Sequence, residues 1–141
     1  MTDITTIQVR EIMTREVIRA RPDITLENAQ HLFTKHHFHH LLIFNQRKLV
    51  GIISDRDILK NTSPFINKLA ERAQDINTLN KPLHQFMSRN IVTIPEAACI
   101  KHAARIMTSR RVSCLPVTDD HHNIVGIITH RDILHLFYRA A

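Results

Sequence analysis

A stretch of ten residues near the middle of the chain returns almost unchanged near its end. Residues 51–60 read GIISDRDILK and residues 126–135 read GIITHRDILH, so seven of the ten positions are identical. An eighth position exchanges Ser54 for Thr129 and keeps the hydroxyl group. Self-similarity at a fixed spacing indicates that one supersecondary unit is used twice. We therefore expect the chain to fold as two copies of that unit.

The similarity extends beyond this block when the sequence is shifted by 74 residues. Apolar residues within 9–13 then align with those of 83–87, and those within 26–41 align with those of 100–115. From the glycines onward the shift is 75, because the intervening polar segment is one residue longer in the second copy. Length variation is typical of loops, so this segment is predicted to be a turn. The only two glycines, Gly51 and Gly126, head the repeated block, which predicts a backbone that passes close to another group or bends there.

Each copy is expected to form a β-α-β-β-α unit. Helical spacing of apolar residues follows a short apolar strand, and two strand-like runs joined by a few polar residues suit an antiparallel hairpin. The predicted strands are 17–20, 41–44 and 49–53 in the first copy and 91–94, 115–117 and 124–128 in the second. A further helix is expected from Ser54 or Thr129 onward. The fold class is therefore α/β (α+β), with helices flanking small mixed sheets in which the first two strands are parallel.

A chain of 141 residues suits one ordinary domain or two small halves that share a core. We assign residues 1–60 to the first repeat, 61–82 to a connector and 83–141 to the second repeat. Ser63 and Pro64 are typical of a helix start, and the apolar residues that follow recur at helical spacing, so the connector is predicted to contain a helix.

Composition bears on the cellular location of the protein and on the class of partner it binds. No run approaches the roughly 18 apolar residues of a membrane span, and the polar N-terminus lacks the apolar core of a signal peptide. Cys99 and Cys114 are the only cysteines and are expected to be reduced thiols, which together with these features predicts a cytoplasmic protein. The formal charge of +6 favours anionic partners, either nucleotides or nucleic acids.

The doubled order of elements, each ending in G-x-x-[ST]-x-x-D and a helix, resembles a CBS domain pair, also known as a Bateman module. The segments LVGIISDRDIL, IVGIITHRDIL and RRVSCLPV carry the resemblance, which covers nearly the whole chain. It implies two repeats packed about a pseudo-two-fold axis, with two clefts that hold adenosine-containing ligands such as AMP, ADP, ATP or S-adenosylmethionine. It also implies a disc-shaped homodimer of two modules.

The repeated motif has a chemistry suited to such ligands. An ionised carboxylate of Asp57 or Asp132 can accept hydrogen bonds from both hydroxyls of a ribose. Three residues earlier, Ser54 or Thr129 stands at a helix start, where backbone N–H groups favour a phosphate. Arg56 and Arg131 can add charge for longer phosphate chains. The competing interpretation is a capping box, since Ser-x-x-Asp before an apolar run is also a local device for starting helices.

The resemblance also implies which residues contact the adenine. In the first copy they are Arg19, Phe38, His39, His40 and Ile53, and in the second Thr93, Ala98, Val112, Ser113, Cys114, Pro116 and Ile128. The two sets differ, because small Ser113 and Cys114 replace His39 and His40, and Pro116 replaces Leu42. We expect the second cleft to be nearer the usual nucleotide pocket of the family.

Other functions were weighed against this one. The histidine-rich run from Lys35 to His40 suggests a metal, but it straddles a predicted helix end and strand start without a neighbouring cysteine or carboxylate, so we expect none. Basic residues are scattered and no zinc-finger or RNP motif is present, which argues against nucleic acid. Enzyme motifs such as a P-loop or G-x-S-x-G are absent, so we expect no catalysis.

The expected function is therefore that of a regulatory module. It would require no cofactor, sense an adenine nucleotide and modulate a separate partner protein. A basic nucleic-acid-binding protein, or an interaction module without a small-molecule ligand, remains the alternative.

Overall fold

The computed structural model describes residues 3–36, 38–61 and 78–140. The described elements are η1 (Ile4–Thr6), α1 (Val9–Ile12), β1 (Arg19–Ala20), α2 (Leu26–His36), β2 (His40–Asn45), β3 (Lys48–Ser54), α3 (Asp55–Asn61), η2 (Leu83–Gln85), β4 (Ile94–Pro95), α5 (Ile100–Arg110), β5 (Cys114–Thr118), β6 (Ile124–Thr129) and α6 (His130–Ala140). The connector helix predicted from Ser63 lies outside the described residues.

Two three-stranded sheets, ordered β1-β2-β3 and β4-β5-β6, confirm the predicted mixed topology. In each, the first strand runs parallel to the second and the hairpin is antiparallel. Both hairpins also carry an irregularity at the same place, where one valine (Val50 or Val125) is left without a partner beside the glycine. The duplicated sequence thus repeats even the local departure from regular pairing.

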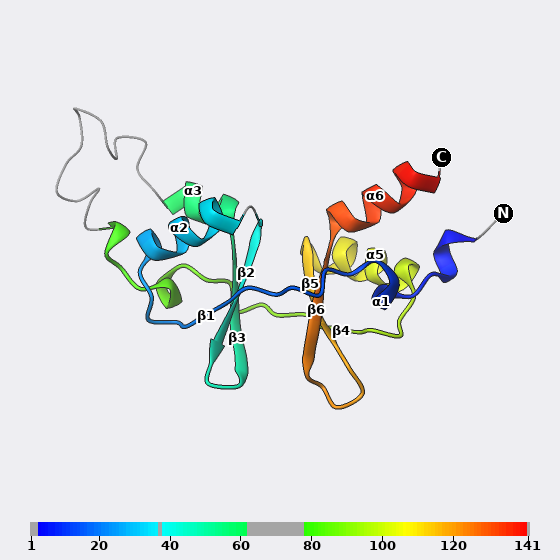
Figure 1. The fold of residues 1–141 in the computed structure, drawn as a ribbon, viewed down its shortest axis with the longest axis horizontal. Coiled ribbons are helices and arrows are strands. Elements are labelled where there is room, and N and C mark those ends of the chain that lie inside the picture. Colours follow the sequence, from blue (N-terminus) through cyan, green and yellow to red (C-terminus); the bar gives the residue numbers. More distant parts are fainter. Residues whose placement is uncertain (1–2, 37, 62–77, 141) are drawn as a thin grey trace. The chain divides into compact units, whose positions relative to one another are not determined.

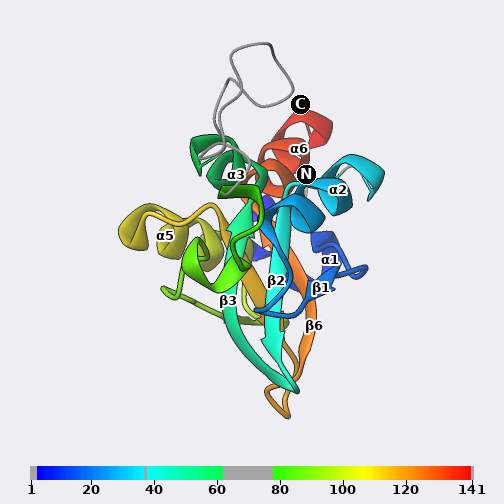
Figure 2. The same cartoon turned by 90° about the vertical axis from the view of Figure 1, so that its left-hand side faces the viewer.

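The first helix of each copy forms because its apolar residues lie on one face. Leu26, Ala29 and Phe33 are buried on α2, at the spacing of three and four that brings side chains together on a helix. The hydroxyl of Thr25 caps this helix by accepting a hydrogen bond from the N–H of Asn28 at 3.1 Å. Figure 2 looks onto this part of the chain and shows α2 and α3 next to each other above the three strands.

The chain divides into two compact units whose boundaries are offset from the sequence repeat. One unit is contiguous, Ile18–Asn90, and the other is discontinuous, Met1–Val17 with Ile91–Ala141. Figure 1 shows the blue N-terminal segment, with η1 and α1, lying with α5 and α6 of the discontinuous unit. The segment before each first strand therefore packs with the hairpin of the other copy.

Backbone hydrogen bonds explain this offset. Thr14 exchanges two hydrogen bonds of 2.9 Å with Ile127, and Ser88 exchanges bonds of 2.8 and 3.0 Å with Ile52. Each bridge lies beside a repeated glycine, and neither glycine has a positive φ angle. The predicted repeat boundaries at residues 60 and 83 describe the sequence duplication, whereas the compact units follow these bridges.

The glycines are required by close approach. A Cβ atom on Gly126 would lie 2.7 Å from the carbonyl oxygen of Thr14, and one on Gly51 would lie 2.8 Å from Cγ of Met87. Met13 and Met87 are buried in the cores of the discontinuous and contiguous units, respectively. The first of the two alternatives predicted for the glycines, a backbone that passes close to another group, is confirmed.

None of the helices in the described ranges has both the length and the apolar character needed to cross a bilayer.

Candidate functional site

The repeated serine or threonine and aspartate meet at the junction of a strand and a helix. Ser54 ends β3, and its backbone N–H donates to Oδ2 of Asp57 at 2.9 Å, while the N–H of Asp57 donates to Oγ of Ser54 at 3.1 Å. The second copy repeats the arrangement between Thr129 and Asp132, with corresponding distances of 2.8 and 3.4 Å. These reciprocal bonds are a capping box, so the local interpretation of the motif holds in both copies.

The capping box uses only part of each carboxylate. The backbone N–H groups of Ser54 and Thr129 both donate to Oδ2 of their aspartate, and Oγ1 of Thr129 also donates to Oδ2 of Asp132, at 3.3 Å. Within the described ranges, Oδ1 of Asp57 and of Asp132 accepts no hydrogen bond, and both side chains are only half-buried. A carboxylate has about four acceptor positions. One oxygen of each motif therefore remains available to a ligand hydroxyl, and capping and ligand binding are compatible.

The start of each hairpin lies beside the corresponding motif. His40 pairs with Ser54 across the sheet, and Cys114 pairs with Thr129. The carbonyl oxygen of His39 accepts the N–H of Asp55 at 3.0 Å, and that of Ser113 accepts the N–H of His130 at 3.1 Å. In each copy the structure thus brings the two predicted residues that begin the hairpin to the predicted helix start.

The first copy carries an ionic contact at this place. Nδ1 of His39 lies 2.8 Å from Oδ2 of Asp55, and both side chains are partly exposed. Burial raises the pKa of Asp55, but the hydrogen bond and the charge of His39 outweigh it, so that the pKa lies below its ordinary value of 3.8. The second copy has Ser113 and His130 at these positions. Asp55 was missed in the sequence, although it occupies one of the three positions at which the ten-residue blocks differ.

The second copy has a buried thiol instead. Cys114 is 6% exposed, and burial followed by the charge of Asp132 raises its pKa to about 12. The thiol is therefore protonated at neutral pH and behaves as a small apolar group beside the carboxylate. This environment is less polar than the one that His39 and Asp55 create in the first copy.

Several predicted adenine contacts lie elsewhere. Cζ of Arg19 lies 4.4 Å from the centre of the Phe44 ring, toward the turn of the hairpin and away from its start at His40. Phe38 packs against Phe33, with 4.8 Å between ring centres. The side chain of Arg19, on β1, is thus directed toward the turn and away from Ser54, and that of Phe38, in the segment before β2, packs against α2.

The remaining predicted residues fall into three groups. Ile53 and Ile128 are fully buried members of the two cores, and Val112 packs against the second core. Ala98 lies beyond the turn end of its sheet, where its carbonyl oxygen accepts the N–H of Val9 at 2.8 Å. Thr93 is exposed just before β4, Pro116 is buried within β5, and Arg56 and Arg131 are exposed on the first turns of α3 and α6. Within each described unit, the structure brings together the residues beside the helix start.

Asp132 also lines a small hollow of about 190 Å³. Its other lining residues come from the end of α1, the residue after it, and α6, namely Glu11, Ile12, Met13, His135, Leu136 and Arg139. This volume is below the roughly 300–1,000 Å³ of typical ligand pockets, so the hollow by itself does not enclose a nucleotide.

The histidine-rich run does not gather into a metal site in the described ranges. His36 is on α2 and His40 on β2, while His37 lies outside those ranges. No group of three or more histidine, cysteine, aspartate or glutamate side chains suited to a metal is found among the described residues.

Comparison with known proteins places this geometry in a family. The model of the CBS domain family matches residues 9–63 and 83–139, which are the two copies of the repeat. The chain is 34% identical over 130 residues to L-aspartate semialdehyde sulfurtransferase of Methanocaldococcus jannaschii, covering 92% of this chain and 23% of the enzyme. It is 31% identical over 134 residues to a CBS domain-containing protein of Dictyostelium discoideum, covering 94% of this chain and 92% of that protein.

A solved structure of similar size gives the same arrangement of elements. The CBS domain pair of protein MJ0100, in complex with 5′-methylthioadenosine and S-adenosyl-L-methionine, superimposes with a TM-score of 0.78 at 31% identity. The match covers 96% of this chain and 99% of that chain. Against several curated relatives, by contrast, the chain spans less than half of their length, between 22% and 46%.

Proposed function

The chain belongs to the CBS domain family, and on that premise we propose that it is a regulatory module that binds adenosine-containing ligands at its two helix starts. The observation that carries the proposal is the available Oδ1 atom of Asp57 and of Asp132, held in place by the capping box. The similar MJ0100 pair is in complex with two adenosine-containing ligands, which supports this ligand class.

The roles of the side chains follow from their chemistry. Oδ1 of Asp132 accepts a ribose hydroxyl, and the first turn of α6 offers backbone N–H groups and the exposed Arg131 to a phosphate or another anionic group. Ser113 and Cys114 border the place where the adenine lies. The corresponding set in the first copy is Ser54, Arg56, Asp57, His39 and His40.

The two copies should differ in what they accept. The protonated Cys114 provides an apolar border in the second copy, which suits the face of a purine ring. His39 and Asp55 provide a polar and partly charged border in the first copy. We propose that the second copy binds the adenosine more tightly. A purine ring that covers the apolar Cys114 displaces little bound water, whereas one that covers His39 and Asp55 removes water from polar groups without forming new polar contacts to them.

Regulation requires that the ligand binds two states of the protein with different affinity. We propose that the affected equilibrium is binding to a separate partner protein, with the chain itself performing no catalysis. The two carboxylates support this, because each already accepts the hydrogen bond of its own capping box, whose other partner is a backbone N–H and not a proton-transfer group. They are therefore not arranged as an acid and base pair.

We also propose that the protein forms a homodimer through α6. Leu134, Phe137 and Tyr138 on this helix are 60%, 55% and 84% exposed, although each is large and apolar or aromatic. A second copy would remove this surface from water. Light scattering coupled to size exclusion should give the mass of a dimer for the wild type and of a monomer for Leu134→Glu, and a monomeric wild type would exclude the proposal.

Calorimetric titration tests the ligand site. Wild-type protein is titrated with AMP, ADP, ATP and S-adenosylmethionine, and then the variants Asp57→Asn and Asp132→Asn are compared with the control Asp120→Asn, which changes an exposed turn carboxylate. Asparagine keeps an acceptor for the cap but loses the charge. We expect Asp132→Asn to weaken binding by about tenfold or more, the effect of losing a charged hydrogen-bond acceptor.

The outcomes separate the alternatives. Absence of binding at millimolar ligand would refute the proposal and leave the motif as a helix cap. Binding unchanged in the Asp57→Asn plus Asp132→Asn double variant would place the site elsewhere. Binding of duplex or single-stranded nucleic acid with a steep dependence on salt would instead favour the nucleic-acid alternative.

A further inference from the structure

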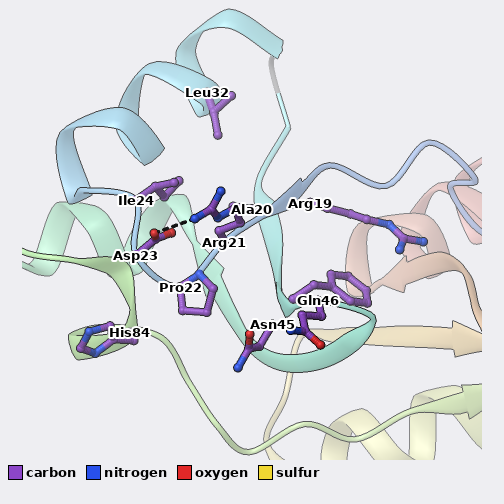
Figure 3. Close-up of a pocket in the computed structure, with 11 residues that line it drawn as sticks. Arg19, Ala20, Arg21, Pro22, Asp23, Ile24, Leu32, Asn45, Gln46 and His84 are labelled. Atoms are coloured by element: carbon purple, nitrogen blue, oxygen red, sulfur yellow. Dashed lines mark hydrogen bonds and ion pairs between the residues drawn. The ribbon is translucent and has the colours of Figure 1, made fainter.

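A hollow of about 950 Å³ lies inside the contiguous unit, at the turn end of its sheet. It is bordered by β1 and the loop after it, by the end of β2 and its turn, and by His84 of η2 (Figure 3). Along β2, Phe44, which lines the hollow, comes four positions after His40, which lies beside Ser54, and four steps correspond to about 13 Å of strand. The hollow is therefore distinct from the ligand site proposed above.

Cationic side chains border this hollow above an apolar floor. Arg19 is held over the ring of Phe44, and Nη2 of Arg21 lies 2.9 Å from Oδ2 of Asp23. Figure 3 shows His84 on the other side of Pro22 from these groups. Asp23 pairs with Arg21, whereas the guanidinium of Arg19 points away from that carboxylate (Figure 3). Since a guanidinium has five donors, the pair with Asp23 leaves most of those on Arg21 available. Apolar surface comes from Pro22, Ile24, Leu32 and Phe44.

The second copy shows that the fold does not require this lining. The N–H of His84 donates to the carbonyl oxygen of Pro22 at 3.1 Å, and the equivalent N–H of Arg10 donates to that of Glu96 at 2.9 Å. The backbones therefore correspond. In the second copy, however, the side chains of Arg10 and Glu96 pair with each other at 3.6 Å.

At the other equivalent positions, too, the second copy lacks the basic and aromatic side chains of the first copy. Thr93, Pro95 and Thr118 stand where the first copy has Arg19, Arg21 and Phe44. The turn of the second copy begins with Asp119 and Asp120, whereas that of the first begins with Asn45 and Gln46. One backbone arrangement thus carries a basic hollow in the first copy and an acidic, internally paired surface in the second. Apart from the turn, which is one residue longer in the second copy, the difference lies in the side chains, and those of the first copy suit an anion.

We propose that this hollow binds a small organic anion, with its phosphate or carboxylate group at Arg21 and its apolar portion against Pro22, Ile24 and Leu32. Arg19 supplies further positive charge and is held by Phe44 in one orientation, which reduces the side-chain entropy lost on binding. Charge-assisted hydrogen bonds to guanidinium groups are the strongest contacts available to such a ligand. The site does not depend on the adenosine sites, because it uses none of their residues.

Phenyl phosphate and benzoate, with uncharged phenol as a control, test the proposal by two-dimensional NMR of the full chain. We expect the amide signals of Arg21, Asn45, Gln46 and His84 to move with phenyl phosphate, benzoate or both, and to stay in place with phenol. The stronger of the two anions identifies the head group. Signals that move only near Ser54 or Thr129, or that move equally with phenol, would overturn the proposal.

Two variants make the test specific. Arg21→Gln should weaken binding by about tenfold, the loss typical of one charged hydrogen-bond partner, whereas Arg105→Gln, an exposed change on α5, should leave it unchanged. Equal weakening in both would indicate general charge attraction and overturn the proposal. The double variant Pro22→Glu plus His84→Arg copies the Arg10–Glu96 pair into the first copy and should abolish binding with the spectrum of the fold intact.

The adenosine sites provide the last control. Asp57→Asn plus Asp132→Asn should bind the aryl anion as the wild type does. Failure of adenosine binding with retention of the aryl anion would therefore refute the proposed function alone, and the reverse result would refute only this inference.

Discussion

Replacing Gly126 with alanine should cost more stability than the same change at Gly51, although the two residues head closely similar segments. The difference lies in the group that each new Cβ atom meets. At position 126 it is the carbonyl oxygen of Thr14, at 2.7 Å, whereas at position 51 it is the side chain of Met87. A backbone oxygen cannot rotate away, but a methionine side chain has three rotatable bonds and adapts.

The expected magnitude for Gly126→Ala follows from the bridge beside it. An ordinary contact begins near 3.4 Å, so Thr14 must withdraw by roughly 0.7 Å, which breaks its two hydrogen bonds of 2.9 Å to Ile127. Losing them costs about 1 kcal/mol each. Alanine restricts the unfolded chain and returns about 0.4–1 kcal/mol. We expect a net loss of about 1–2 kcal/mol in the free energy of unfolding, rising with any residual overpacking against Met13.

For Gly51→Ala we expect less than about 1 kcal/mol, because the rotation of Met87 relieves the contact and the hydrogen bonds between Ser88 and Ile52 remain. Urea denaturation followed by circular dichroism, at one fixed protein concentration, measures both variants. Equal losses, or a larger loss for Gly51→Ala, would refute the argument from close approach.

Double variants separate the two mechanisms further. Met87→Ala removes the atoms that the new Cβ at position 51 meets, so the Gly51→Ala and Met87→Ala changes should couple favourably by more than the error of the cycle. Met13→Ala should not rescue Gly126→Ala, because the carbonyl oxygen of Thr14 stays in place. A full rescue there would show that the side chain, rather than the backbone, sets the cost.

Three further predictions concern single groups. A thiol reagent at about pH 8 should modify Cys99 but not Cys114 in the folded protein, because burial raises the pKa of Cys114, and it should modify both in urea. Mass spectrometry of the labelled peptides checks this. Early labelling of Cys114 in the folded protein would contradict it. Because the pKa of Asp55 is lowered in the folded protein, this carboxylate stabilises the fold at pH values above its ordinary pKa of 3.8, and the stabilisation is lost as the pH falls through its pKa in the folded state. In acid titrations, Asp55→Asn should therefore lose less stability below about pH 4 than the wild type does. An unchanged titration would refute the pairing with His39. Arg111 is the C-cap of α5 and has a φ of 54°, a left-handed conformation that glycine adopts without strain. Arg111→Gly should therefore raise the free energy of unfolding by up to about 1 kcal/mol in urea denaturation. A lower free energy of unfolding would show that contacts of the arginine side chain outweigh the backbone strain.

The sequence predicted the repeated elements because periodicity reports which residues face a core. Leu26, Ala29 and Phe33 are buried on α2 as their spacing indicated, and the hairpins pair antiparallel with parallel first strands. The bounds of short strands were less predictable. The first strand was expected at 17–20 but consists of Arg19 and Ala20, since two paired residues leave little pattern to read.

Contacts that depend on three-dimensional partners could not be predicted. Periodicity does not indicate that Thr14 bonds to Ile127 in the other copy, because both segments look apolar and extended in either arrangement. A long side chain such as that of Arg19 can reach either end of a strand, and its position over Phe44 depends on which ring is nearby. The contact between His39 and Asp55 joins residues sixteen positions apart, and only the antiparallel hairpin brings them together.

Because backbone bridges are exchanged between the two copies, the repeated sequence unit and the compact folded unit are not the same stretch of chain. Duplication copied a segment that starts before α1, but the folded body that contains α1 is completed by residues from the far end of the chain. A truncation of the first seventeen residues should therefore damage the discontinuous unit and leave the contiguous unit intact. A gene fragment cut at the repeat boundary would yield neither body whole, whereas a circular permutant that begins at residue 91 would make both continuous.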